Sequence, residues 1–90
     1  MKICVAGAAG AFGMKHLEAT AAIDGIEGVS VVGGAPDDIE GFAKQRKIPH
    51  WTKNLDDDLA RADVQAVILA TPTQIHAAQA IACMNAGKHV

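Results

Sequence analysis

The sequence has few aromatic residues and only two cysteines. Aromatic residues make up 3% of the 90 residues although half of the chain is apolar. Alanine, valine, isoleucine and glycine take their place, which suits helices packed closely against a β-sheet. Cys4 and Cys83 lie far apart and match no metal-binding or redox spacing. We therefore expect two buried thiols in a reducing cytoplasm, and no metal site.

The sequence also lacks a basic stripe, a long apolar run and a recognisable signal peptide. Its 8 basic and 10 acidic residues are interspersed and give a net charge of −2, which argues against nucleic acid as a partner. No apolar run is long enough to span a membrane, and Met1 and Lys2 lead directly into a strand-like run. The sequence predicts a cytoplasmic protein with no nucleic-acid or membrane partner.

Four apolar stretches are typical of β-strands. The first, KICVA at Lys2–Ala6, is almost continuously apolar, as a strand covered on both faces requires. Two more are residues 29–32 and the short extended piece 48–52, and residues 64–70 carry the strongest strand pattern. Residues 88–90 resemble the beginning of a further strand, which the chain does not continue.

Helical patterns separate these strands. Residues 11–23 place Gly13, Leu17 and Ala21 on one face. Pro36 fits the first turn of a second helix, and a short third helix follows residue 54. Thr73 is predicted to cap the fourth, which ends at Gly87. The second, third and fourth helices take their apolar faces from Ile39, Phe42 and Ala43, from Leu55, Leu59 and Ala62, and from Ala77, Ile81 and Met84.

Strands that alternate with helices imply a parallel sheet with right-handed crossovers. The predicted fold class is α/β, with helices flanking the sheet. Because residues 88–90 have the pattern of a strand that has only begun, we expect the chain to be truncated after its fourth βα unit.

The segment VAGAAGAFGMKH places glycines at Gly7, Gly10 and Gly13 between the first strand and the first helix. In a dinucleotide fingerprint the three glycines permit a tight turn, close approach of backbone to the pyrophosphate, and close packing of helix on sheet. Here the first spacing is one residue longer, so Ala8 and Ala9 are interpreted as small spacers that leave room for phosphate. A glycine-rich connection that binds nothing is the alternative, and the strand–turn–helix context favours cofactor binding in a Rossmann-type fold.

The end of the second predicted strand indicates which cofactor is preferred. An acidic residue there would bind the ribose hydroxyls of NAD, but the sequence has Gly33 and Gly34, and Asp37 comes several residues too late. The missing carboxylate favours NADP slightly over NAD. No arginine follows at once to bind a 2′-phosphate, because Arg46 and Lys47 lie a helix away.

A second signature follows the strongest predicted strand. Thr71 and Pro72 stand at its carboxyl end, where open α/β sheets bind ligands. His76 lies on the first turn of the next helix. On spacing alone, a single histidine in this position is more often structural than functional.

Three motifs together resemble the glucose–fructose oxidoreductase/inositol dehydrogenase family (Gfo/Idh/MocA). They are AGAAGAFGMKH, ATPTQIH and AGKHV, and the resemblance covers essentially all 90 residues. It implies an NAD(P)-dependent dehydrogenase that acts on a sugar-like, polyol, hemiacetal or semialdehyde substrate. The segment from Thr71 to Val90 is similar to family members that degrade aromatic compounds.

The resemblance also implies cofactor contacts along three segments. They are Gly10, Ala11 and Phe12 at the pyrophosphate, Gly33 and Gly34 at the adenosine ribose, and Ala70, Thr71, Pro72, Thr73 and His76 toward the nicotinamide. Residues 1–90 would be an incomplete N-terminal dinucleotide-binding domain. A second domain that carries the substrate pocket and the catalytic residues would lie beyond Val90. We therefore expect the 90 residues alone to be inactive and the full-length enzyme to be a homo-oligomer.

Two other functions remain open from the sequence. One is a non-enzymatic dinucleotide-sensing module that regulates a partner, and the other is an α/β fold that binds no nucleotide.

Overall fold

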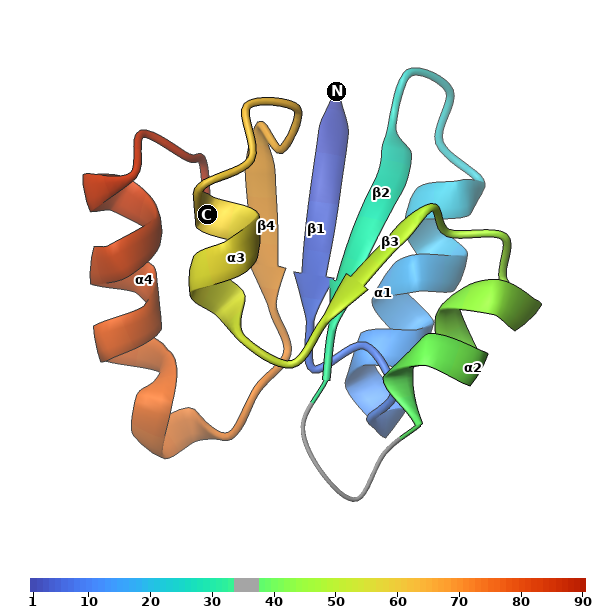
Figure 1. The fold of residues 1–90 in the computed structure, drawn as a ribbon, viewed down its shortest axis with the longest axis horizontal. Helices are drawn as coiled ribbons and strands as arrows, with labels where there is room; N and C mark the ends of the chain where they lie inside the picture. The colour runs from blue at the N-terminus through green and yellow to red at the C-terminus, as the bar shows by residue number, and fades with distance from the viewer. Residues whose placement is uncertain (34–37) are drawn as a thin grey trace.

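The computed structural model describes residues 1–33 and 38–90, which form a four-stranded parallel sheet with helices on both faces (Figure 1). The strands are β1 (Lys2–Ala6), β2 (Glu27–Val32), β3 (His50–Thr52) and β4 (Ala66–Leu69). Their order is β3-β2-β1-β4, and every pair is parallel. This arrangement confirms the predicted Rossmann-type α/β fold.

The helices are α1 (Ala11–Ala21), α2 (Ile39–Gln45), α3 (Leu55–Leu59) and α4 (His76–Asn85), with a short 3₁₀ helix, η1 (Thr73–Ile75), before α4. Helices α1 and α2 lie to one side of the sheet, and α3 and α4 to the other (Figure 1). The first helix ends two residues before the predicted residue 23, and the third ends before Ala62. The predictions for Gly34, Pro36 and Asp37 fall outside the described residues.

The structure shows how helices α2 and α4 begin, and the start of α4 differs from the sequence prediction. Asp38 caps α2 by accepting a hydrogen bond from the Gly41 amide at 3.0 Å. The prediction that Thr73 caps the fourth helix is wrong, because Thr73 opens η1 and neither η1 nor α4 has a side-chain cap. Pro72 precedes η1 with an extended backbone, and the chain tightens into the 3₁₀ turn before α4 begins.

Two apolar clusters fill the spaces on either side of the sheet. The α1/α2 side contains buried Ile3 and Val5 of β1, with Leu17 of α1 and Ile39 of α2. The other side contains Cys4 and Ala6 of β1, among others. The side chains of β1 therefore alternate between the two clusters, as the pleat of a central strand requires. The near-continuous apolarity of this strand arises because both of its faces are covered.

The predicted apolar face of α4 is wrong. Ile81 and Met84 are 56% and 58% exposed, whereas Cys83 is fully buried. Ala80 and Cys83 follow the same helical spacing one residue earlier, so the pattern fits two faces equally well. The helix turns its smaller side chains toward the sheet.

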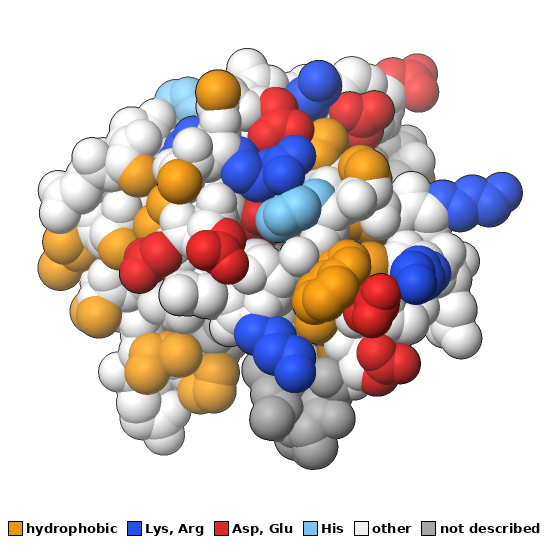
Figure 2. Space-filling view, viewed as in Figure 1, with side chains coloured by type: hydrophobic (Ala, Val, Ile, Leu, Met, Phe, Trp, Pro, Cys, Tyr) orange, Lys and Arg blue, Asp and Glu red, His pale blue; other side chains and the backbone are white. Residues whose placement is uncertain are grey.

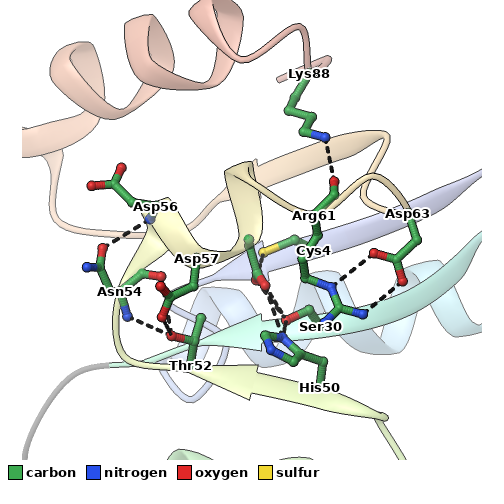
Figure 3. A network of polar contacts seen from close by, with 11 residues as sticks. Cys4, Ser30, His50, Thr52, Asn54, Asp56, Asp57, Arg61, Asp63 and Lys88 are labelled. Atoms are coloured by element: carbon green, nitrogen blue, oxygen red, sulfur yellow. Dashed lines mark hydrogen bonds and ion pairs between the residues drawn. The ribbon is translucent and has the colours of Figure 1, made fainter.

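A buried polar cluster links the sheet to α3 (Figure 3). Asp58 is fully buried and accepts hydrogen bonds from the Ser30 hydroxyl at 2.7 and 2.9 Å and from the Cys4 thiol at 2.9 Å. His50 Nδ1 lies 3.0 Å from Asp58 Oδ1 and 2.7 Å from the Ser30 oxygen. One carboxylate thus joins β1, β2, β3 and α3, and nothing in the sequence pattern indicated it.

Residues 88–90 were predicted to begin a further strand. His89 forms a parallel bridge with Ala66: its amide donates to Gln65 O at 3.1 Å, and its carbonyl accepts from the Val67 amide at 2.8 Å. The bridge lies on the free edge of β4, where the next strand of a parallel sheet would pair. Within residues 1–33 and 38–90, no helix has the length and apolarity needed to cross a bilayer.

We expect both thiols to be unreactive in the folded protein. Cys4 and Cys83 are fully buried free cysteines, which form no disulfide bond. Burial raises the pKa of both thiols, and the hydrogen bond and negative charge of Asp58 raise the pKa of Cys4 further. Because the thiolate is the nucleophile, labelling by a thiol reagent at pH 8 should be slower than in the denatured protein by about a hundredfold or more. Labelling in guanidinium is the control, and equally fast labelling of the native protein would contradict the burial of these residues.

Candidate functional site

A cleft of about 600 Å³ opens at the carboxyl ends of the strands. This edge also holds the starts of α1, α2 and α4 (Figure 1). The residues that line the cleft come from the glycine turn, from the ends of β2, β3 and β4, and from α3, η1 and α4: Gly7, Gly10, Val32, Gly33, Lys53, Leu55, Ala70, Thr71, Pro72, Ile75 and Gln79. Six of the twelve predicted site residues lie among them. The position agrees with the rule that open parallel sheets bind ligands outside the carboxyl ends of their strands.

Gly7 allows the chain to turn sharply between two strand ends. Its φ is +76°, and a Cβ at this position would lie 2.5 Å from the carbonyl oxygen of Ala70. Its amide donates to Val32 O at 2.8 Å. Position 7 therefore requires glycine for two reasons: the backbone has a positive φ, and the segment that follows β4 approaches too closely for a side chain.

Gly13 allows α1 to lie against the turn. A Cβ on Gly13 would overlap the carbonyl oxygen of Gly7 and lie 2.7 Å from Cα of Ala8. The third fingerprint glycine is expected to allow close packing of the helix, and in this structure Gly13 allows α1 to pack closely on the turn that follows β1. Gly13 is buried and does not line the cleft.

Gly10 differs from the other two glycines because the protein itself leaves space beside it. Its φ and ψ are −76° and 166°, which any residue can adopt, and a Cβ would meet only Gly7 O, at 3.4 Å. Gly10 lines the cleft and precedes α1, whose start has no capping side chain. The first-turn amides of Ala11, Phe12 and Gly13 have no acceptor within the helix. Such amides and the positive end of the helix dipole suit an anion.

The two alanines of the turn have different surroundings. Ala8 is fully buried in the cluster on the α1/α2 side, and Ala9 is half-buried. Neither lines the cleft. The extra residue of this glycine loop is thus accommodated by turning Ala8 into the core, so that it does not act as a spacer beside the cleft.

Gly33 contributes backbone to the cleft at the end of β2. It is buried, and a Cβ would meet the side chain of Ile39 at 2.9 to 3.3 Å. A side chain introduced at this position would therefore point at Ile39 of the apolar cluster.

The segment after β4 forms the opposite wall of the cleft. The Ala70 amide donates to Ala6 O at 2.9 Å, which continues the pairing of β4 with β1. Thr71 and Pro72 follow, and the Thr71 hydroxyl donates to the side-chain oxygen of Gln79 in α4. This hydrogen bond fixes the loop to the helix and places two polar groups at the cleft wall.

Four predicted site residues in the described chain lie outside the cleft lining, besides Gly13. Ala11, Phe12 and Thr73 are exposed, with Phe12 at 74%. His76 is half-buried at the start of α4, and its Nε2 has no hydrogen-bond partner among the described residues. An unpaired buried nitrogen at a helix start identifies a group that remains free to bond with something else.

Sequence reasoning missed five lining residues: Val32, Lys53, Leu55, Ile75 and Gln79. Lys53 directly follows β3 and Leu55 begins α3. The rule used for Thr71 would have pointed to them had it also been applied to the end of the predicted extended piece 48–52. Ile75 and Gln79 could not be found in this way, because η1 shifts the start of α4. No group of three or more His, Cys, Asp or Glu side chains within residues 1–33 and 38–90 is arranged to hold a metal ion. Figure 2 shows acidic and basic side chains interspersed on one face of the molecule.

Comparison with known proteins identifies related sequences and structures. A family model described as an oxidoreductase family with an NAD-binding Rossmann fold matches residues 1–90. The chain is 53% identical over its whole length to 4-carboxy-2-hydroxymuconate-6-semialdehyde dehydrogenase from Sphingobium sp. (strain NBRC 103272 / SYK-6). It spans 28% of the length of that relative.

Solved structures share the fold of the entire chain. Scyllo-inositol dehydrogenase from Lactobacillus casei, solved with NAD(H) and scyllo-inositol, superposes with a TM-score of 0.89 at 27% identity, over 100% of this chain and 26% of its own. A 3-ketoreductase from Actinomadura kijaniata, solved with TDP-benzene and NADP, superposes with a TM-score of 0.85 at 25% identity, over 100% of this chain and 28% of its own. The cofactor bound therefore differs between these two neighbours.

Proposed function

The chain belongs to the Gfo/Idh/MocA family of oxidoreductases, and from this membership we propose that it forms the dinucleotide-binding part of an NAD(P)-dependent dehydrogenase. The observation that carries the proposal is the cleft of about 600 Å³ at the carboxyl edge of the sheet. Gly7, Gly10 and Gly33 line it on one side, and Thr71 and Pro72 on the other.

In this proposal the cofactor lies across the edge of the sheet with its diphosphate at the start of α1. The amides of Ala11, Phe12 and Gly13 donate to the phosphate oxygens, and Gly10 lets the phosphate approach the backbone. The adenosine ribose lies beside Gly33, at the end of β2. The glycine turn fits such a group, since the space beside Gly10 is open whereas the spaces beside Gly7 and Gly13 are filled.

The nicotinamide end lies on the β4 side of the cleft. Ala70, Thr71 and Pro72 pass beneath it. Thr73 in η1 and His76 at the start of α4 lie nearby. The bound cofactor supplies or accepts the hydride. The hydrogen bond from Thr71 to Gln79 holds the loop that orients the ring. The Nε2 of His76, which has no partner among residues 1–33 and 38–90, provides a polar group close to this end.

NADP is proposed as the preferred cofactor, because no carboxylate follows β2 at Gly33 and Gly34 to bind a free ribose 2′-hydroxyl. The substrate is proposed to be a sugar-like, polyol, hemiacetal or semialdehyde compound, since relatives include a semialdehyde dehydrogenase and a scyllo-inositol dehydrogenase. A role in aromatic-compound degradation follows from the former relative. The enzyme would work in the cytoplasm, where NADP is available.

Residues 1–90 match only part of the length of their relatives. The residues that bind substrate and transfer the proton are proposed to lie in the remaining part. Catalysis needs the substrate carbon positioned against the nicotinamide and a group that takes up the proton. The cleft offers one wall for this, so residues 1–90 alone are expected to be inactive. The whole enzyme is proposed to be a homo-oligomer.

Replacing Gly10 with leucine should weaken the binding of both NADPH and NADH by at least about tenfold, or ~1.4 kcal/mol. A bulky side chain at Gly10 meets only Gly7 O within the protein, so its bulk enters the space proposed for the diphosphate. Titration of the fluorescence of each reduced nucleotide measures the loss.

Gly10→Ala is the matched control, because it makes the same backbone change with less bulk. Its effect on affinity should be smaller, and both variants should keep the circular dichroism of the parent. Equal affinity of the parent and Gly10→Leu would contradict the position proposed for the diphosphate. An unmodified protein that binds neither nucleotide would contradict the proposed function as a whole.

A further inference from the structure

Lys53 is a basic side chain that lines the cleft and that the family motifs do not include. It follows β3 and borders the cleft beside Gly33 and Leu55. It also borders a smaller hollow of about 180 Å³ with Asp38, Ile39, Glu40 and Trp51. One lysine thus lies where the two spaces meet, on the β2–β3 side of the sheet edge.

The backbone around Lys53 is fixed on both sides. The Gly33 amide donates to Thr52 O at 3.1 Å, which holds the residue before Lys53 against the end of β2. On the other side, the Asn54 amide donates to the Thr52 hydroxyl at 3.1 Å, and the Asn54 side chain caps α3 through the Asp56 amide at 3.0 Å. Figure 3 shows Thr52 and Asn54 facing each other across this turn.

The acidic groups that share the smaller hollow with Lys53 are bonded elsewhere. Asp38 accepts the hydrogen bond of the Gly41 amide as the cap of α2, and Glu40 pairs with Lys44 at 3.1 Å. The Lys53 ammonium forms no ion pair within residues 1–33 and 38–90. Its charge is therefore available to a ligand in the cleft.

The other basic residues near this part of the sequence have different surroundings. The Arg46 guanidinium lies 4.6 Å from the centre of the Phe42 ring, and the residue lines a separate hollow between α1 and α2. Lys47 follows at the far end of α2 from the cleft. Neither lines the cleft.

We propose that Lys53 binds the 2′-phosphate of NADP and so sets the cofactor preference of this protein. The inference rests on the proposed function, which puts the adenosine ribose beside Gly33. A phosphomonoester on that ribose carries close to two negative charges. The hydrogen bond between Gly33 and Thr52 makes Lys53 the neighbour of the ribose position, and the four-carbon stem of lysine gives the ammonium reach. In this protein the end of β3 supplies the cation that the glycines after β2 do not.

The test compares NADPH and NADH binding by the parent, Lys53→Gln, Lys53→Arg and the control Lys47→Gln. Lys53→Gln should weaken NADPH binding by about tenfold, since charge-assisted hydrogen bonds are the stronger ones, and change NADH binding by less than about twofold. Lys53→Arg should restore most of the NADPH affinity. Lys47→Gln removes the same charge at the other end of α2 and should change neither. Adenosine 2′,5′-bisphosphate should lose affinity on Lys53→Gln, whereas adenosine 5′-diphosphate should not.

Each alternative result overturns the inference in a recognisable way. Equal loss of NADPH and NADH affinity in Lys53→Gln would show a general effect on the cleft, and unchanged NADPH affinity would show that Lys53 does not contact the phosphate. A loss of the same size in Lys47→Gln would show a long-range charge effect. If the parent binds neither nucleotide, the proposed function fails first, and this inference fails with it.

Discussion

Replacing Gly13 by alanine is expected to lower the free energy of unfolding by about 3 kcal/mol or more, although only one methyl group is added. That methyl would overlap the carbonyl oxygen of Gly7 and lie 2.7 Å from Cα of Ala8 and 2.8 Å from the carbonyl carbon of Gly7. All three are backbone atoms, so no side-chain rotation can relieve the overlap. Either α1 moves away from the sheet or the glycine turn is distorted. Urea unfolding followed by circular dichroism at 222 nm measures the loss.

Gly10→Ala provides the comparison for Gly13→Ala, because it adds the same methyl three residues earlier. There the nearest atom is Gly7 O at 3.4 Å, so the stability should change by less than about 1 kcal/mol. The two variants therefore separate two roles within one motif. Gly13→Ala should damage the fold, and Gly10 substitutions should damage binding. Similar stability of both variants would contradict the packing described for α1.

The fold could be predicted because each of its strands carries a local signal. The apolar run of β1, the glycines of the turn and the Thr71-Pro72 break each indicate an element or its end from a few consecutive residues. Alternation of these elements then allows few topologies. The predicted positions of Gly7, Gly10, Ala70 and Thr71 at one edge follow from that topology alone.

The direction in which side chains point could not be predicted from the sequence. In α4, the sets Ala77–Ile81–Met84 and His76–Ala80–Cys83 have the same helical spacing, and only packing against β4 selects the second. The sequence predicted that Gly33 would lie at the adenosine ribose, but it did not indicate that a side chain at this position would meet Ile39. Lys53 was missed because the residues that follow the predicted extended piece 48–52 include no glycine or proline to mark a ligand-binding turn.

The cluster around Asp58 also could not be predicted from the sequence, because its members are separated by up to 54 positions along the chain. Acidic residues on a short helix ordinarily face solvent, and Asp56 and Asp57 do so. Asp58 turns inward because Leu55 and Asp58, three residues apart, share the buried side of α3. A buried carboxylate is tolerated only when its oxygens are bonded, and the Ser30 hydroxyl and the Cys4 thiol meet that need.

Replacing Asp58 by alanine is expected to destabilise the protein by about 3–5 kcal/mol, the cost of removing one partner from a buried polar cluster. The Ser30 hydroxyl and the Cys4 thiol would each lose their acceptor in an apolar space, and His50 Nδ1 would lose its carboxylate partner at 3.0 Å. Small domains have roughly 5–15 kcal/mol of stability, so the variant should retain little of its folded structure on warming. Thermal unfolding of the two proteins measures the difference.

Two further variants decide whether the cluster itself accounts for this loss. Asp56→Ala removes an exposed carboxylate from the first turn of the same helix and should cost no more than about 1 kcal/mol. Ser30→Ala removes the principal hydrogen-bond donor to Asp58. The double variant Ser30→Ala/Asp58→Ala should therefore lose less stability than the sum of the two single variants, with a coupling energy of about 0.5–3 kcal/mol. Additive costs would mean that Asp58 stabilises α3 by some route other than Ser30.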